Sequence, residues 1–350
     1  MSVSLVSFYS YLQQLNSTDY VTISGKIKKK FSLKQQHYDV INQALLMKDL
    51  QISLTVQHKT AFIRFSKCLE LPDSIPSYIQ LCKENKHDTT SAIYLNFFKF
   101  INCTLNIKDA DVILEHCLIV DTFLYATGNY GNILVLKSSK TKYFFSVKTP
   151  CIVIKYNRLV FVIHSQISSV ILAIKVKYVF LMNSTFHDLS SSNTSSISPT
   201  LNIHKSYSVL ISKSYFKNIS GVRVIDVGII NFIYSRFQNC TCALSVKGTF
   251  YAERRAYIFQ TQFLACICKN KHGILGLLFS FSENKNSSQS SHVSISLNRV
   301  SFKHCGLPNS AGAFSLSAKS RSHLHFNVTC LIDLCLFMNN TSTQSGGGIY

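Results

Sequence analysis

Four cysteines stand at a spacing that could support chemistry. Cys240 and Cys242 are separated by one residue, and Cys266 and Cys268 repeat that spacing 26 residues later. Thiols at equivalent places of neighbouring repeats could form disulfides or hold a soft metal ion. They could equally be small buried side chains in one slot of successive repeats. His, Asp and Glu are scarce around them, so we assign no metal and leave a disulfide and a cysteine ladder as alternatives.

Three acidic residues are the nearest approach to a catalytic set. Asp109 and Asp111 flank Ala110, and Asp121 follows ten residues after Asp111. Paired carboxylates can transfer protons or bind Ca²⁺, but acidic residues in turns are more often simply solvated. We therefore assign no catalytic residue and keep these three as candidates. The sequence contains no phosphate-binding or dinucleotide-binding motif, so we expect no cofactor.

The chain is strongly basic. Its 350 residues include 36 Lys and Arg but only 16 Asp and Glu, a formal net charge of +20. Such a chain attracts polyanions. The lysines are dispersed apart from one run at 26–30, and no nucleic-acid-binding signature is present. We expect no nucleic-acid partner, and a basic scaffold that binds other polyanions remains an alternative function.

A repeat must position these residues. Six phenylalanines spaced by 21 to 39 residues anchor it, with apolar residues five and seven positions before each Phe. In the first four copies a Ser or Thr stands two positions before the Phe. Alternation with period two indicates a strand with one buried face. The anchors are Phe186, Phe216, Phe237, Phe263, Phe302 and Phe337, with an earlier partial copy at Phe100.

The repeat predicts an all-β solenoid. One unit cannot bury its own apolar face, so copies must stack at the strand spacing of about 4.8 Å, which creates a Phe ladder. A 21-residue copy is too short for a four-stranded propeller blade. We expect one domain over residues 1–350. Residues 1–24 form a short helical cap with a strand at Tyr20–Ser24, and residues 25–350 form coils that continue beyond the C-terminus in a longer protein.

These repeats resemble the coils of the right-handed parallel β-helix, the pectin-lyase-like fold. Phe337–Asn340, with Gly346–Ile349 after it, is also similar to the FxxN and GGA[ILV] repeats of polymorphic outer-membrane proteins and adhesin-like β-helices. Gly348 stands where that family usually has Ala. The resemblance implies a non-enzymatic extracellular or cell-surface scaffold that presents a groove and loops to a glycan or protein. The alternative it implies is a polysaccharide lyase or hydrolase with a divergent site.

Asn-x-Ser/Thr sequons occur ten times and favour the secretory pathway, although the first 15 residues lack the features of a signal peptide. No run of 18 apolar residues exists, so we expect no transmembrane segment. Four sequons begin two residues after a repeat Phe, where we expect an interior ladder of asparagines: Asn102, Asn218, Asn239 and Asn339. Asn193 and Asn286, in Ser/Asn-rich loops, are the better candidates for glycosylation.

Overall fold

A computed structural model describes most of the chain from residue 92 onward and short strands before it. The described residues are 20–24, 45–48, 51–55, 63–65, 92–96, 98–101, 104–108, 111–128, 130, 132–142, 151–187, 200–250, 254–268, 274–281, 291–306, 312–320, 326–341 and 349. All 33 elements formed by these residues are β-strands.

The strands form three parallel sheets of eleven strands each among the described residues, which we name A, B and C. Sheet A contains β1 (Tyr20–Ser24), β3 (Gln51–Thr55), β7 (Thr104–Lys108), β10 (Phe123–Thr127), β13 (Ile152–Lys155), β16 (Ile171–Ile174), β19 (Leu201–His204), β22 (Val222–Ile225), β25 (Leu244–Phe250), β28 (Leu275–Phe281) and β31 (Phe314–Ser320). Sheet B contains β2 (Leu45–Lys48), β6 (Phe98–Ile101), β9 (Leu118–Val120), β12 (Lys140–Lys142), β15 (Gln166–Ser168), β18 (Thr185–His187), β21 (Tyr215–Lys217), β24 (Arg236–Gln238), β27 (Gln262–Leu264), β30 (Ser301–Lys303) and β33 (Leu336–Met338). Sheet C contains β4 (Ile63–Phe65), β5 (Ala92–Asn96), β8 (Asp111–Glu115), β11 (Ile133–Lys137), β14 (Leu159–Ile163), β17 (Tyr178–Met182), β20 (Ser208–Ser212), β23 (Ile229–Ile233), β26 (Arg254–Phe259), β29 (Ser291–Asn298) and β32 (Phe326–Asp333).

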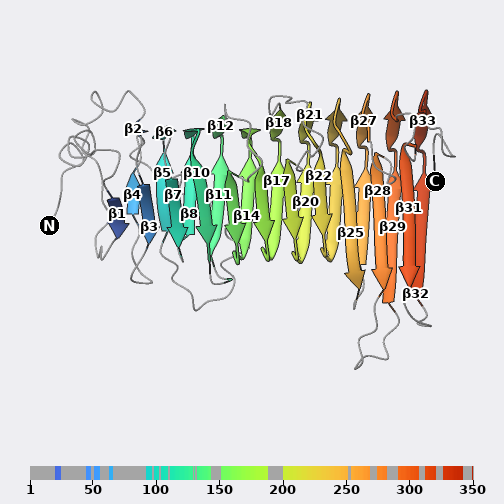
Figure 1. Cartoon of the computed structure of the whole chain (residues 1–350), viewed down its shortest axis with the longest axis horizontal. Helices are drawn as coiled ribbons and strands as arrows, with labels where there is room; N and C mark the ends of the chain where they lie inside the picture. Colours follow the sequence, from blue (N-terminus) through green and yellow to red (C-terminus); the bar gives the residue numbers. More distant parts are fainter. Residues whose placement is uncertain are drawn as a thin grey trace.

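From β5 onward the chain visits sheets C, B and A in strict rotation, so every third strand pairs in parallel with its predecessor. The result is a right-handed parallel β-helix, which is the solenoid that the repeat predicted in the form that the resemblance implied. The coils lie side by side from one end of the molecule to the other (Figure 1). The first four strands join the ends of the sheets out of this rotation. The predicted strand at Tyr20–Ser24 is β1, whereas the predicted helical cap lies outside the described residues.

The interior of sheet B is the predicted Phe ladder. All six anchor phenylalanines are in register on consecutive strands, and neighbouring rings stack with centroids 4.6 to 5.0 Å apart. Phe100 occupies the same column near the other end of the helix, where it pairs with Ile119. The residues five and seven positions before each Phe form two inward columns on sheet C. Each stacked aromatic pair adds about 0.5–1.5 kcal/mol to the burial of its rings.

Single residues with positive φ turn the chain at the corner between sheets C and B. The residue after each turn is Ser or Thr in six coils, and its hydroxyl donates to the carbonyl two residues earlier at 2.9 to 3.1 Å. Most of these hydroxyls also accept an N–H from the preceding coil. This ladder satisfies backbone groups that the bend leaves unpaired. The turning residues are His116, Ser138, His164, Asn183, Lys213, Tyr234, Gln260, Arg299 and Leu334.

The predicted interior ladder of asparagines is wrong. Asn218, Asn239 and Asn339 are exposed residues with positive φ at the corner between sheets B and A. The residue after each of them turns inward instead, as buried Ile219 and Cys240 do. Successive side chains of an extended chain point to opposite sides, so two neighbouring residues at a corner do not both point into the core. Asn102 lies outside the described residues.

Candidate functional site

Positive charge covers the described surface. Among the residues whose side chains are described, 17 are Lys or Arg and four are Asp or Glu. One of the four, Glu115, lies 2.7 Å from the Lys137 ammonium group. The cations are concentrated where the chain leaves sheet A and enters sheet C, which we call the A–C corner. This corner is therefore the first candidate for a binding site.

The geometry of the A–C corner follows from one residue per coil with positive φ. These residues are Tyr156, Lys175, Lys205 and Asp226, with φ of 53° to 57°. A small buried residue follows each, and the next residue is again at the surface, as Lys177 is. Since each coil contributes two outward positions at the same place, their side chains form two columns along the helix.

Eight cations lie at this corner and on the strand ends that adjoin it, and Arg223 lies beside them on β22; we call these nine residues the basic corner. It extends over five coils from β13 to β26 and includes one described acidic residue, Asp226. The members of the basic corner are Lys155, Arg158, Lys175, Lys177, Lys205, Arg223, Lys247, Arg254 and Arg255.

Tyrosines alternate with these cations. Tyr130 and Tyr207 are more than half exposed, and Tyr130 packs edge-on against Tyr156 with ring centroids 5.4 Å apart. The Lys175 ammonium lies 5.2 Å from the centre of the Tyr156 ring, and Lys177 lies at the same distance from Tyr178. Such cation–π contacts hold the ammonium groups in place while leaving them accessible. The corner thus combines fixed positive charge with exposed aromatic faces.

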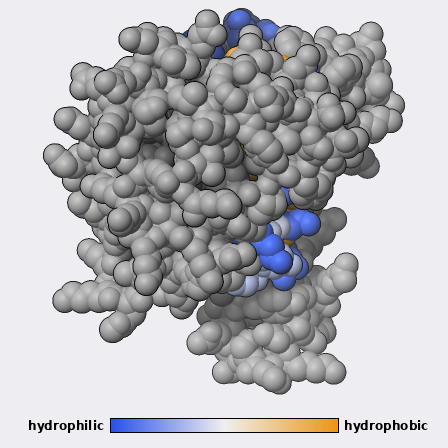
Figure 2. All heavy atoms as spheres, turned by 90° about the vertical axis from the view of Figure 1, so that its left-hand side faces the viewer, coloured by the Kyte–Doolittle hydropathy of each residue, from blue (hydrophilic) through white to orange (hydrophobic). Residues whose placement is uncertain are grey.

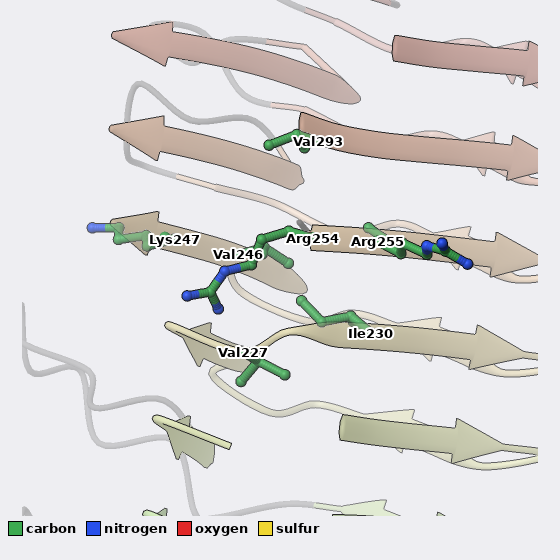
Figure 3. A pocket seen from close by; sticks show the side chains of 9 residues that line it. Val227, Ile230, Val246, Lys247, Arg254, Arg255 and Val293 are labelled. Carbon is green, nitrogen blue, oxygen red and sulfur yellow. The ribbon is translucent and has the colours of Figure 1, made fainter. Parts of the chain in front are cut away.

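Arg254 and Arg255 extend the basic corner at β26. Their side chains leave the strand in opposite directions, beside Lys247, Val227 and Val246 (Figure 3). Burial lowers the pKa of Arg254, although nearby Asp226 opposes that shift. The cavity between these residues is about 10 Å³, which is room for about one water molecule. A ligand of this corner would therefore lie across the surface rather than enter a pocket.

His204 lies on the outer face of sheet A beside the basic corner. Its Nε2 and the Asn202 Oδ1 are 2.6 Å apart. Burial, reinforced by the positive charge of Arg223, holds the pKa of His204 below its usual value. The imidazole is therefore neutral near pH 7 and adds charge to this surface only on acidification.

Of the three candidate acidic residues, the structure places the backbones of two, Asp111 and Asp121. Asp111 begins β8 where the chain enters sheet C, and Asp121 has positive φ at the corner between sheets B and A, so their backbones lie at two different corners of the coil. Asp109 and the side chain of Asp111 lie outside the described residues. Within the described part of the chain, no three His, Cys, Asp or Glu side chains gather as metal ligands.

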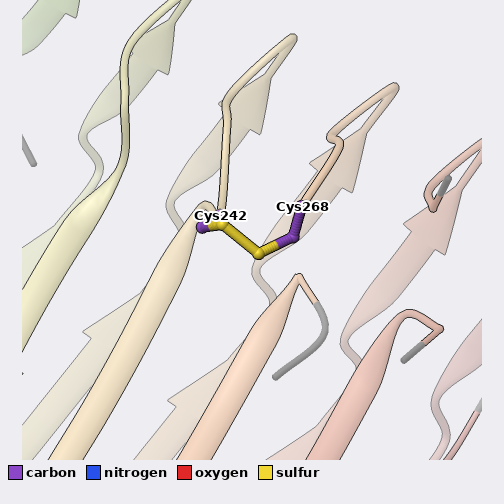
Figure 4. Close-up of a disulfide and its surroundings, with 2 residues drawn as sticks. All are labelled: Cys242 and Cys268. Atoms are coloured by element: carbon purple, nitrogen blue, oxygen red, sulfur yellow. A yellow bond between two sulfur atoms is a disulfide. The ribbon is translucent and has the colours of Figure 1, made fainter. Parts of the chain in front are cut away.

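The cysteines take both forms that the sequence left open. Cys242 and Cys268 form a disulfide that joins neighbouring coils (Figure 4). Cys240 and Cys266 are buried free thiols in one column with Cys305. Burial raises the pKa of Cys266, and a hydrogen bond with Cys266 raises that of Cys305. The Cys266 and Cys305 thiols are therefore protonated at neutral pH and unreactive. Burial would raise the pKa of Cys240 as well, but its hydrogen bond with Cys266 and two backbone hydrogen bonds outweigh burial and lower that pKa.

Sequence reasoning did not single out the basic corner, because its lysines are dispersed along the chain. Lys175, Lys205 and Asp226 stand eleven residues before Phe186, Phe216 and Phe237. Extending the repeat alignment upstream to that position would have found the column. The glycosylation candidates Asn193 and Asn286 lie outside the described residues.

Other parts of the surface are less distinctive. Viewed from the end that carries β1, the visible atoms of described residues are mainly hydrophilic (Figure 2). No helix within the described ranges is long and apolar enough to cross a membrane. Comparisons with models of known protein families, with curated proteins and with solved structures each found no match to this chain.

Proposed function

We propose that the protein is a non-catalytic, extracellular or cell-surface scaffold that binds a linear acidic glycan along the basic corner. The observation that carries this proposal is the excess of nine cations over one described acidic residue, interleaved with exposed tyrosines. Carboxylate or sulfate groups would pair with Lys and Arg, and sugar rings would lie on the tyrosine faces.

The repeat spacing supports a linear ligand. Successive coils are about 4.8 Å apart, a length comparable to one sugar unit in a polysaccharide. A chain with one acidic group per one or two sugars would therefore meet a cation on nearly every coil. Exposed ion pairs contribute only about 0.2–1 kcal/mol each, so binding would need several coils at once.

Two further observations favour a glycan over a nucleic acid. The Cys242–Cys268 disulfide indicates an oxidising compartment, where extracellular glycans are the common polyanions. In addition, the coils resemble the pectin-lyase-like fold, whose enzymes act on polysaccharides. The separation of Asp111 from Asp121 gives no support to cleavage of the glycan, so we propose binding alone.

Binding to immobilised probes at increasing NaCl tests the proposal. The probes are heparin, polygalacturonate, single-stranded DNA and neutral dextran. We expect retention on one or both acidic glycans that weakens steeply with salt, and none on dextran. Equal retention on DNA would reassign the site to polyanions in general. Failure to bind either acidic glycan at low salt would overturn the proposal.

A further inference from the structure

The corners of sheet B carry a second kind of surface. Asn183 lies at its corner with sheet C, and Asn218, Asn239 and Asn339 lie at its corner with sheet A. All four have positive φ, between 48° and 55°, and all four are exposed. Each begins a sequon: Asn183-Ser-Thr, Asn218-Ile-Ser, Asn239-Cys-Thr and Asn339-Asn-Thr.

Positive φ decides which way these side chains point. The residue after each asparagine is the one that turns toward the interior, and Ser184, Ile219 and Cys240 are all buried. The asparagine therefore projects from the outside of the bend. None of the four side-chain amides has a hydrogen-bond partner among the described residues. Asn tolerates this backbone conformation better than most residues, so the position itself needs no further interaction to be stable.

Asn340 provides an internal contrast. It begins the overlapping sequon Asn340-Thr-Ser, one residue after Asn339. Its Oδ1 accepts the Cys305 N–H at 2.9 Å, and its Nδ2 donates to the Phe302 carbonyl at 3.1 Å. A sugar on this Nδ2 would remove that donor from its place in the coil. Of two adjacent acceptors, one is therefore open to modification and the other is part of the fold.

We propose that Asn183, Asn218, Asn239 and Asn339 carry N-linked glycans and that Asn340 does not. In this reaction the asparagine Nδ2 forms a bond to C1 of the first sugar of a lipid-diphosphate-linked oligosaccharide. The bond from that C1 to the diphosphate oxygen breaks, and the lipid diphosphate leaves with the bonding electrons while the amide loses one proton. A glycan on any of the four lies outside the closed coil, whereas a glycan on Asn340 would displace its hydrogen bond to Phe302, so the chains that complete this fold are those with Asn340 unmodified.

The sites are arranged around one sheet. Asn218 and Asn239 lie in one column on consecutive coils, since β21 pairs directly with β24. Sheet B borders two of the three corners of each coil, and the A–C corner is the third. The glycans would therefore line the margins of sheet B and leave the basic corner open. This inference is independent of polyanion binding, because the sequons and the lysines are different residues at different corners.

Secreted expression of the full chain in animal cells, behind an added signal peptide, tests the inference. Intact mass is measured before and after peptide-N-glycosidase treatment, and the modified asparagines are mapped from their conversion to Asp. Material is taken from both the medium and the secretory compartments. We expect glycans at the four sites and an unmodified Asn340.

Matched variants complete the test. N183D, N218D, N239D and N339D each remove an acceptor while keeping a residue that tolerates positive φ, so the fold is retained. Each is expected to lose one glycan from the intact mass, whereas N231D, at an asparagine of β23 outside any sequon, is expected to lose none. An unchanged mass after enzyme treatment would overturn the proposal. So would modification confined to Asn340 or to asparagines other than these four.

Discussion

The stacked phenylalanines of sheet B should make the middle of the helix far more sensitive to truncation than its last coil. Phe237 is fully buried and stacks on Phe216 at 4.6 Å and on Phe263 at 4.9 Å. Phe337, in the last described coil, stacks on Phe302 alone at 5.0 Å among the described rings and is half-buried. The substitutions Phe237→Ala and Phe337→Ala therefore remove the same atoms from two different environments.

The magnitudes follow from burial and stacking. Truncation of a core Phe to Ala costs about 3–5 kcal/mol, and loss of two stacked pairs places F237A at about 4–5 kcal/mol. F337A removes a side chain that is only half-buried and breaks one stacked ring pair, so we expect it to cost about 2 kcal/mol. The control F237L keeps most of the volume and should cost only about 1.5 kcal/mol.

Urea unfolding, followed by far-ultraviolet circular dichroism and by tyrosine fluorescence, measures these differences. The chain has 17 Tyr and no Trp, so the tyrosine signal is usable. Coincidence of the two probes is required, because solenoids can unfold in parts. Equal costs for F237A and F337A, or a cost of F237A no larger than that of F237L, would refute a continuous ladder.

Other predictions concern the disulfide and pH. Opening the Cys242–Cys268 bond, which joins residues 26 positions apart, should cost about 3.5 kcal/mol by the loop-entropy relation. The variant C242S/C268S should therefore have a lower urea midpoint than the parent protein. Dithiothreitol should lower the urea midpoint of the parent but not that of the variant. Acidification should destabilise the fold through His204: its folded pKa lies below the ordinary value of 6.5, so the unfolded chain binds the proton more readily and stability falls as pH drops below that value. The melting temperature should decrease from pH 7 to 5 more in the parent than in H204Q, and parallel curves would contradict a role for His204.

The interior was predictable from the sequence because it repeats one physical requirement. Each coil must place a large apolar residue at the centre of sheet B, and Phe186 through Phe337 satisfy it at irregular intervals. The varying intervals do not disturb the alignment, because the described strands on either side of them keep their register.

The corners were less predictable because their conformation is a property of the backbone. Positive φ occurs there in Lys, Tyr, His and Gln as well as in Asn, so residue type alone does not mark it. Distance from the Phe therefore predicts, wrongly, that Asn218 and Asn239 face the interior. The buried Ile219 and Cys240 beside them, already visible as apolar repeat positions, were the better guide to which residue points inward.

The basic corner is the central functional claim, and a matched charge deletion tests it most directly. K175N, K177Q and K205N together remove three cations, with Asn placed where φ is positive. K140Q, K213N and K217Q remove three cations from sheet B and its margin, again with Asn at a positive φ. At about 0.5 kcal/mol per exposed ion pair, the first triple should weaken acidic-glycan binding about tenfold, and the second should leave it nearly unchanged. Equal loss in both triples would show that net charge binds the glycan, and would contradict a site at the A–C corner.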